Sequence, residues 1–239
     1  MDSLEPIDEA YLSTVRQPWS MKLANNLKKQ FAYQVFMGSG ATESNIKANI
    51  QYGNVLYFGT HAIANAADPL RSKLVLAKEI GPQTEDGYLH AYELYGIPLE
   101  ADLAVLNACE SGLGNLQKGE GMISLAYSLH YAGCLSTVMS LWKVDEKINT
   151  QITKDFLQYL KKGYAKSDAL RQAKLDFLND SQMETPHPFY WAGMVLMGND
   201  GQVEFQQRPW IWFVLAGFIA LLFLGYKFTS SRSQKLDSL

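Results

Sequence analysis

Along the first 200 residues, short apolar runs alternate with stretches in which apolar and polar residues follow a helical period. The short runs are mostly apolar throughout, as expected of strands that are covered on both faces. They predict strands at Gln34–Met37, Val55–Phe58, Leu74–Ala77, Leu103–Asn107, Thr137–Leu141 and Ala192–Leu196.

Four stretches carry apolar residues three or four positions apart, which predicts helices with one buried face. The first helix follows Ser20, Gly163 ends the third, and Ser167 is the predicted N-cap of the fourth. Strands alternating with helices predict an α/β sandwich with a largely parallel sheet. Residues 64–88, with two prolines and two glycines, predict an irregular excursion around one short hairpin. The four apolar faces consist of Leu23, Leu27 and Phe31; Met122, Leu125, Ala126 and Leu129; Ile148, Ile152, Phe156 and Leu160; and Leu170, Ala173, Phe177 and Leu178.

The pattern changes after Pro209. From Trp210 to Tyr226 the chain has 17 residues without a charge, with aromatic residues at both ends. Such a run can span a hydrocarbon core of ~30 Å, and aromatic edges match the interfacial belt of a membrane helix. We therefore expect one C-terminal transmembrane helix; a buried core helix is the alternative. The expected organisation is a lead segment 1–18, a globular domain 19–200, a linker 201–209, the transmembrane helix 210–228 and a basic tail 229–239.

Composition narrows the function classes. Hydrophobic residues make up 47% of the chain and charged residues 19%, which is enough apolar surface for a packed core. The net charge of −3 disfavours a nucleic-acid partner, because such a protein needs a clustered basic face. Two cysteines without CxxC or His/Cys ligand spacing predict neither a disulfide framework nor a metal site. The Gly38-Ser39-Gly40 turn lacks the third glycine of a phosphate-binding loop, so we expect no bound nucleotide. We also expect no other cofactor.

Candidate chemistry lies where two predicted strands end. The strand at Val55–Phe58 leads into His61, and the strand at Leu103–Asn107 leads into Cys109. Parallel strands end at the same edge of a sheet, so we expect the two side chains to be neighbours, with the imidazole helping to form a thiolate. Small residues after Cys109 let a backbone loop point amides at an oxyanion. An inert cysteine at the end of a buried strand is the alternative.

The chain resembles the CHAT domain, a bacterial branch of the caspase-like peptidases related to separase, in five ordered motifs: YFGTHA, LNACESGLG, KGEGMISLAYSLHYAGC, VMSLWKVDE and HPFYWAGMVLMG. The resemblance runs from about Trp19 to Gly198. It implies a caspase-like sandwich in which His61 is the general base and acid and Cys109 attacks a peptide carbonyl. The implied oxyanion hole consists of the amides of Cys109 and Ala62. Because the family's domain usually starts with an extra strand, we expect an N-terminally short fold with one uncovered sheet edge.

The resemblance also implies that the segment after the LWKV motif lines the pocket for the residue before the scissile bond. In that pocket Asp145 or Glu146 would favour a basic side chain, and Trp142 would form an apolar wall. Asp145 also precedes a predicted helix, so a role as its N-cap is an equal alternative.

Together these features predict a membrane-anchored cysteine endopeptidase that cleaves a protein or peptide substrate. Its regulation would come from a protein partner or from an N-terminal sensor, such as the helical TPR array that often precedes the domain in the family. The alternative is a catalytically inactive caspase-like scaffold that binds protein partners.

Basic residues predict the orientation in the membrane. Arg208 stands alone before the apolar run, whereas Lys227, Arg232 and Lys235 follow it. This bias places the tail in the cytoplasm and the domain in the periplasm, at a bacterial inner membrane. If Met1 is the natural start, the domain has no signal peptide and would be cytoplasmic.

Overall fold

The computed structural model describes residues 17–31, 34–65, 67–79, 85–108, 120–180 and 187–205. The chain divides into two compact units, Met1–Val203 and Glu204–Leu239. The architecture below is that of the first unit.

The main sheet has four strands in the order β1-β5-β6-β7. β1 (Val55–Phe58), β5 (Leu103–Leu106) and β6 (Ser136–Ser140) are parallel, and β7 (Met194–Gly198) runs antiparallel to β6. The largely parallel sheet is therefore confirmed. Four of the six predicted strands form it, with ends that differ by up to two residues.

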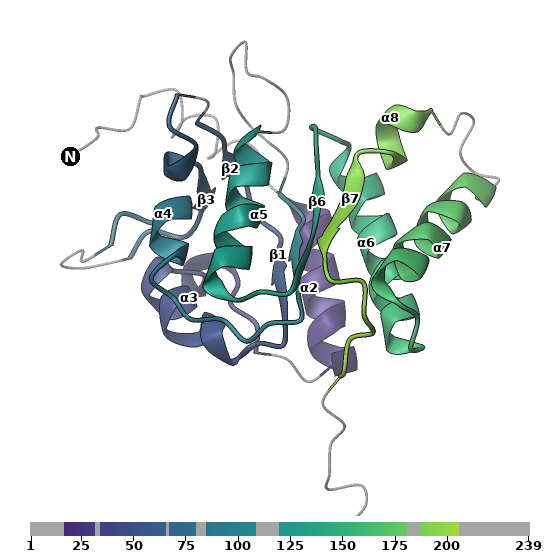
Figure 1. Ribbon diagram of the computed structural model, residues 1–239, viewed down its shortest axis with the longest axis horizontal. Helices are drawn as coiled ribbons and strands as arrows, with labels where there is room; N and C mark the ends of the chain where they lie inside the picture. Colours follow the sequence, from purple (N-terminus) through teal and green to yellow (C-terminus); the bar gives the residue numbers. More distant parts are fainter. Residues whose placement is uncertain are drawn as a thin grey trace, which may run out of the picture. The chain divides into compact units, whose positions relative to one another are not determined.

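Helices cover both faces of this sheet (Figure 1). β5 and β6 are buried at every position, which explains why their sequences are apolar or small throughout. The α/β sandwich is confirmed. One face carries α2 (Pro18–Phe31), α6 (Glu146–Lys161) and α7 (Lys166–Asn179); the other carries α3 (Glu43–Asn49), α4 (Ala91–Leu94) and α5 (Glu120–Ala132).

The excursion after β1 is a second sheet of three antiparallel strands, where one hairpin was predicted. It comprises β2 (Ala62–Ile63), β3 (Lys73–Val75) and β4 (Tyr88–His90) in that order. The predicted strand at Leu74–Ala77 corresponds to β3 and belongs to this small sheet, not to the main sheet. Its apolar pattern alone does not show which of the two sheets it joins. Short helical turns occur at Gly38–Gly40, Ile50–Tyr52 and Pro69–Arg71, and α8 spans Pro188–Trp191.

The prediction of a strand at Gln34–Met37 is wrong. In the described residues no backbone hydrogen bond joins this run to β1, so β1 is an edge strand of the main sheet. A cavity of about 450 Å³ lies here, and its walls include all four residues of β1, part of α2 and the run itself. The apolar pattern of Gln34–Met37 thus reflects contact with this cavity rather than pairing in a ladder.

Helix ends follow the predictions in part. Gly163 follows the C-cap of α6 with φ +86°, a conformation that glycine adopts without strain, so its role is confirmed. The N-cap of α7 is Ala165, so the prediction of Ser167 is wrong. Instead, the backbone N–H and the hydroxyl of Ser167 donate to the carboxylate of Asp200, which lowers the pKa of Asp200.

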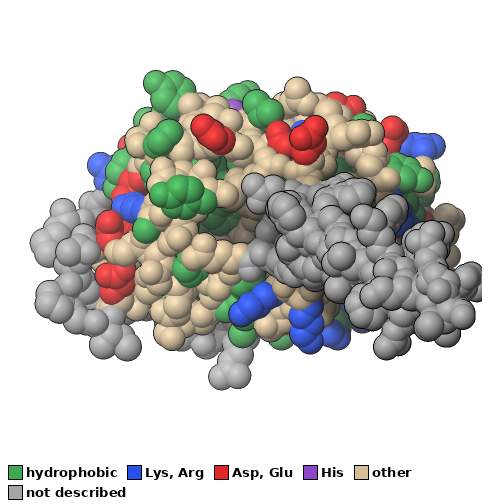
Figure 2. All heavy atoms as spheres, turned by 90° about the horizontal axis from the view of Figure 1, so that it is seen from below, with side chains coloured by type: hydrophobic (Ala, Val, Ile, Leu, Met, Phe, Trp, Pro, Cys, Tyr) green, Lys and Arg blue, Asp and Glu red, His purple; other side chains and the backbone are tan. Residues whose placement is uncertain are grey.

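No helix within the described ranges has the length and apolar character needed to cross a membrane. The predicted helix 210–228 lies outside those ranges. Figure 2 shows one face of the molecule, on which Lys and Arg side chains form small separate groups and hydrophobic side chains are scattered. Among the described side chains of this face there is no continuous basic stripe.

Candidate functional site

The register of β1 and β5 shows how the two strands that precede the predicted dyad are aligned. Phe58 pairs with Leu106 at the carboxyl ends of these parallel strands. His61 comes three positions after Phe58, and Cys109 comes three positions after Leu106. The chain therefore leaves two neighbouring strands at the same level and reaches the two predicted catalytic residues after equal numbers of residues. The Cys109 side chain itself lies outside the described residues.

His61 is held by both its backbone and its ring. Its carbonyl oxygen accepts a hydrogen bond from the Val75 N–H at 2.8 Å, which ties it to β3. Its ring nitrogen Nδ1 lies 3.1 Å from Nε2 of Gln17, the residue before α2. Ala62, whose amide is a predicted oxyanion donor, is buried at the start of β2 and pairs with Leu74. Its oxyanion role stays a prediction.

A buried amide network anchors the end of β5, two residues before Cys109. The side-chain nitrogen of Asn107 lies within hydrogen-bond distance of three hydroxyl oxygens, which share its two N–H groups: those of Tyr57 (2.9 Å), Ser20 (3.2 Å) and Thr150 (3.3 Å). Its carbonyl oxygen accepts from Asn149 Nδ2 at 2.5 Å. Burial raises the pKa of Tyr57, so its hydroxyl stays neutral. The network joins β5 to β1, α2 and α6 beside the candidate site.

Sequence reasoning missed this network. The available signal was Asn107 itself, an amide directly after four buried apolar residues. A polar residue in that position needs partners from other elements, because a buried amide without them is costly.

Replacing Asn107 with Ala should lower the free energy of unfolding by about 2–3 kcal/mol, since buried hydroxyls and the Asn149 amide lose their partner. Urea titration of the variant measures the loss. The matched control is Asn25→Ala, because Asn25 is an exposed amide on α2 that bonds only within its own helix turn. A loss no larger than that of the control would contradict the role of the network.

The predicted pocket residues follow β6, the next parallel strand. Trp142 donates its indole N–H to the carbonyl oxygen of Phe189 at 2.8 Å, and the two rings stack with centroids 6.3 Å apart. Gly193 passes so close that an added Cβ would lie 2.6 Å from the indole. Trp142 therefore packs between the end of β6 and the segment around α8, and its role as a wall of the substrate pocket stays a prediction.

Both predicted acidic pocket residues act at helix N-termini. Asp145 is the N-cap of α6 and accepts a hydrogen bond from the Ile148 N–H at 3.1 Å. Glu146 Oε1 accepts from the backbone N–H groups of Trp19 (3.0 Å) and Ser20 (2.9 Å), in the first turn of α2. These amides have no partner within their own helix, so Glu146 caps α2 from another element. The N-cap role of Asp145 is therefore confirmed, and its role in a substrate pocket stays a prediction.

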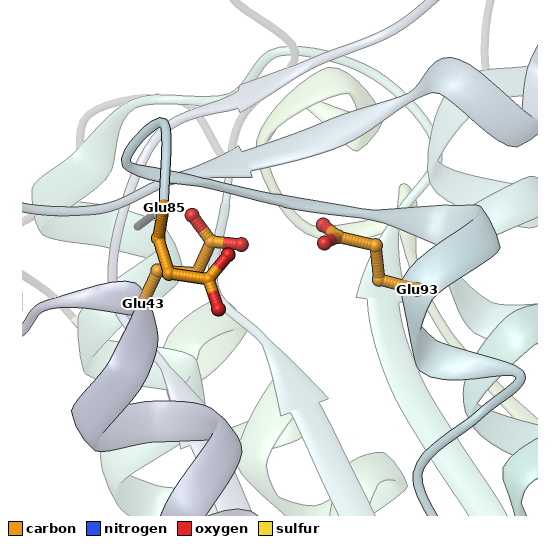
Figure 3. A group of neighbouring side chains, drawn as sticks. All are labelled: Glu43, Glu85 and Glu93. Carbon is orange, nitrogen blue, oxygen red and sulfur yellow. The ribbon is translucent and has the colours of Figure 1, made fainter. Parts of the chain in front are cut away.

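A cluster of three carboxylates lies on the other face of the sheet. Figure 3 shows the side chains of Glu43 and Glu85 close together and that of Glu93 turned toward them from α4. Their oxygen atoms lie within 4.8 Å of one another, a spacing that could suit a metal ion. However, Lys47 Nζ lies 2.6 Å from Glu43, 3.0 Å from Glu85 and 2.7 Å from Glu93. The ammonium group supplies the positive charge that a metal would bring.

The charges in this cluster shift one another's protonation. Burial raises the pKa of Glu43 to about 7, and the like charges of Glu93 and Glu85 add to this. Burial alone would lower the pKa of Lys47, but its hydrogen bonds to the three carboxylates outweigh that effect and raise it. Glu43 also accepts a hydrogen bond from the Gly87 N–H, so the cluster ties α3 to the segment before β4.

Comparison with known proteins identifies the family of the chain. No curated protein matches the chain. The family model of the CHAT domain matches residues 12–199, which include the main sheet, the small sheet and the strand ends described above. This family has a fold related to that of caspase-like peptidases. The chain belongs to the CHAT domain family.

Proposed function

We propose that this protein is a cysteine endopeptidase that uses a His61–Cys109 dyad. The observation that supports it best is the pairing of Phe58 with Leu106, from which both residues are three positions away. From such a register we expect the two side chains to be close enough to exchange a proton. The tie between His61 and β3 adds support, because it fixes the backbone of the base.

In the proposed reaction, His61 takes the thiol proton of Cys109 and the thiolate attacks the peptide carbonyl carbon. The backbone amides of Cys109 and Ala62 stabilise the negative oxygen of the tetrahedral intermediate. His61 then gives the proton to the leaving amine as the C–N bond breaks. Water, deprotonated by the same imidazole, hydrolyses the thioester and restores the thiol.

Alkylation of cysteine tests this proposal, because the chain has only two cysteines. Cys134 is buried, and burial raises the pKa of its thiol to about 11, so it should react slowly. Iodoacetamide at neutral pH should therefore label Cys109 first, as mass spectrometry of peptides will show. His61→Ala should slow this labelling about 10-fold or more, because the thiolate loses its base. An equal rate in both proteins would contradict the dyad.

The second candidate is a caspase-like scaffold that binds protein partners without cleaving them. It is favoured by one observation: the carboxylates of Asp145 and Glu146, which should recognise a substrate, already bond to backbone amides at helix ends. Rapid labelling of Cys109 that requires His61 would rule against the scaffold.

Specificity for a basic residue before the scissile bond is part of the proposal, and Asp145 tests it. Asp145→Asn should keep the melting temperature, since Asn caps a helix as well as Asp does. If the carboxylate contacts substrate, kcat/KM should fall about 10-fold for an Arg substrate and little for a neutral one. Asp145→Ala also removes the cap and should cost about 1 kcal/mol of stability. Equal losses on both substrates would leave capping as the role of Asp145.

We also propose that residues 210–228 anchor the protein in a bacterial inner membrane with the domain in the periplasm, and that a TPR region or another partner regulates it. The support is the charge-free run and the excess of basic residues after it. Protease treatment of intact spheroplasts tests the orientation. An accessible C-terminal tag together with a protected domain would contradict it.

A further inference from the structure

Gln17 contacts the ring of His61 from a position that other parts of the fold hold in place. Its Nε2 lies 3.1 Å from His61 Nδ1, although the two residues are 44 positions apart in sequence. The backbone carbonyl of Gln17 accepts from the Met21 N–H, so the residue stands at the start of α2. Glu146 binds the next two amides of that helix. The amide of Gln17 is thus presented to the imidazole by a fixed backbone.

The other end of the same amide has no partner among the residues that the structure describes. Gln17 Oε1 is buried and accepts no hydrogen bond from any described residue. A buried carbonyl oxygen without a donor is uncommon and calls for a physical reason. Here the reason lies in the shape of the amide group, whose oxygen and nitrogen ends occupy nearly the same space. Turning the group by half a rotation brings Oε1 to Nδ1 and leaves the nitrogen in the unpartnered place.

The two orientations have different consequences for His61. A neutral imidazole has one N–H and one lone pair. When the Gln17 nitrogen donates to Nδ1, the ring proton sits on Nε2, which then cannot accept a proton from a thiol. When Oε1 accepts from Nδ1–H, Nε2 keeps its lone pair and can act as the base. Each orientation pairs one end of the amide with the ring and leaves the other end without a partner among the described residues.

We propose that Gln17 is the positioning residue of His61 and that the orientation of its amide selects the tautomer of the ring. With the oxygen toward Nδ1 the base is competent, and with the nitrogen toward Nδ1 it is not. This inference rests on the proposed dyad, in which Nδ1 faces Gln17 and the exchange with the Cys109 thiol falls to Nε2. Because Gln17 directly precedes α2, a partner that moves this helix would move the amide relative to the ring.

Two variants of similar size separate the possibilities. Gln17→Glu offers only acceptors once ionised, so it should hold the proton on Nδ1 and leave Nε2 unprotonated. Gln17→Met has no N–H donor and only a weakly accepting sulfur, so it should leave the tautomer unconstrained. ¹⁵N chemical shifts of the His61 ring, recorded at about pH 9 where an imidazole is neutral, report which nitrogen carries the proton. Asn25→Asp makes the same chemical change at an exposed site of α2 and should shift neither nitrogen.

The rate of Cys109 alkylation provides the second measurement. Gln17→Glu should label at least as fast as the natural protein, and Gln17→Met about 10-fold more slowly. Ring shifts that are the same in all three proteins, or a Gln17→Met rate equal to the natural one, would overturn the inference while leaving the dyad intact. Labelling that does not depend on His61 would overturn the proposed function, and the ring shifts would still decide whether Gln17 selects the tautomer.

Discussion

Peptide cleavage should disappear in both Cys109→Ala and His61→Ala, with kcat/KM falling by about 10³-fold or more in each variant. The first variant removes the attacking atom, and the second removes the group that takes and returns the proton. Because members of a dyad act as a unit, the double variant should be hardly worse than either single one. The assay uses peptide libraries with Arg, Lys or Asp before the cleaved bond, and mass spectrometry identifies the products.

Fold and chemistry can be separated in this experiment. His187→Ala is the control for loss of an imidazole, because His187 caps α8 in an exposed position. It should retain activity. Circular dichroism should give all variants the same spectrum, since His61 is only half-buried. Cleavage that persists in Cys109→Ala would show that the nucleophile is another residue.

Replacing Lys47 with Met should cost about 2–4 kcal/mol of stability, because it leaves three neighbouring carboxylates without their shared cation. Met has a similar length and apolar stem, so the loss reports charge more than packing. The loss should shrink at about pH 4, where the carboxyl groups take up protons. Urea titrations at about pH 4 and pH 8 measure both values. Equal losses at the two pH values would contradict an electrostatic origin.

The same cluster predicts how stability depends on pH in the natural protein. The pKa of Glu43 rises from its ordinary 4.5 to about 7 in the fold, so the folded state holds a proton that the unfolded state releases. This contribution to stability is complete below pH 4.5 and is lost as the pH rises through about 7. Glu43→Gln should flatten the slope in this range, whereas Glu100→Gln, at an exposed position, should not. An unchanged slope in Glu43→Gln would contradict the raised pKa.

Local pattern was enough to predict the strands on which the site depends. β1, β5 and β6 are fully or half-buried, and their mostly apolar or small residues match the pattern of strands covered on both faces. Parallel pairing places Phe58 and Leu106 at the same level, and from this register we expect His61 and Cys109 to be neighbours. The prediction from this pattern is wrong at Gln34–Met37, because a run of apolar residues that lines a cavity can show the same sequence pattern as a buried strand.

The contacts that surround the site were beyond sequence reasoning. Gln17 and His61 are 44 positions apart, Ser20 and Asn107 are 87 apart, and Ser20 and Glu146 are 126 apart. The residues near Glu146 in sequence do not show whether its carboxylate caps a distant helix or binds a substrate. Only the packing of α2 beside α6 decides which amides that carboxylate meets.

The place of β1 at the edge of the sheet has a consequence for amide hydrogen exchange. β5 and β6 are flanked by strands on both sides and buried at every position, so their amides should exchange only when the whole domain unfolds. β1 has a strand on one side, the cavity on the other and alternate half-buried residues, so it should open at lower free energy. The strand that leads to His61 should therefore open locally at a lower free energy than the strand that leads to Cys109, whose amides should be among the most protected of the described domain.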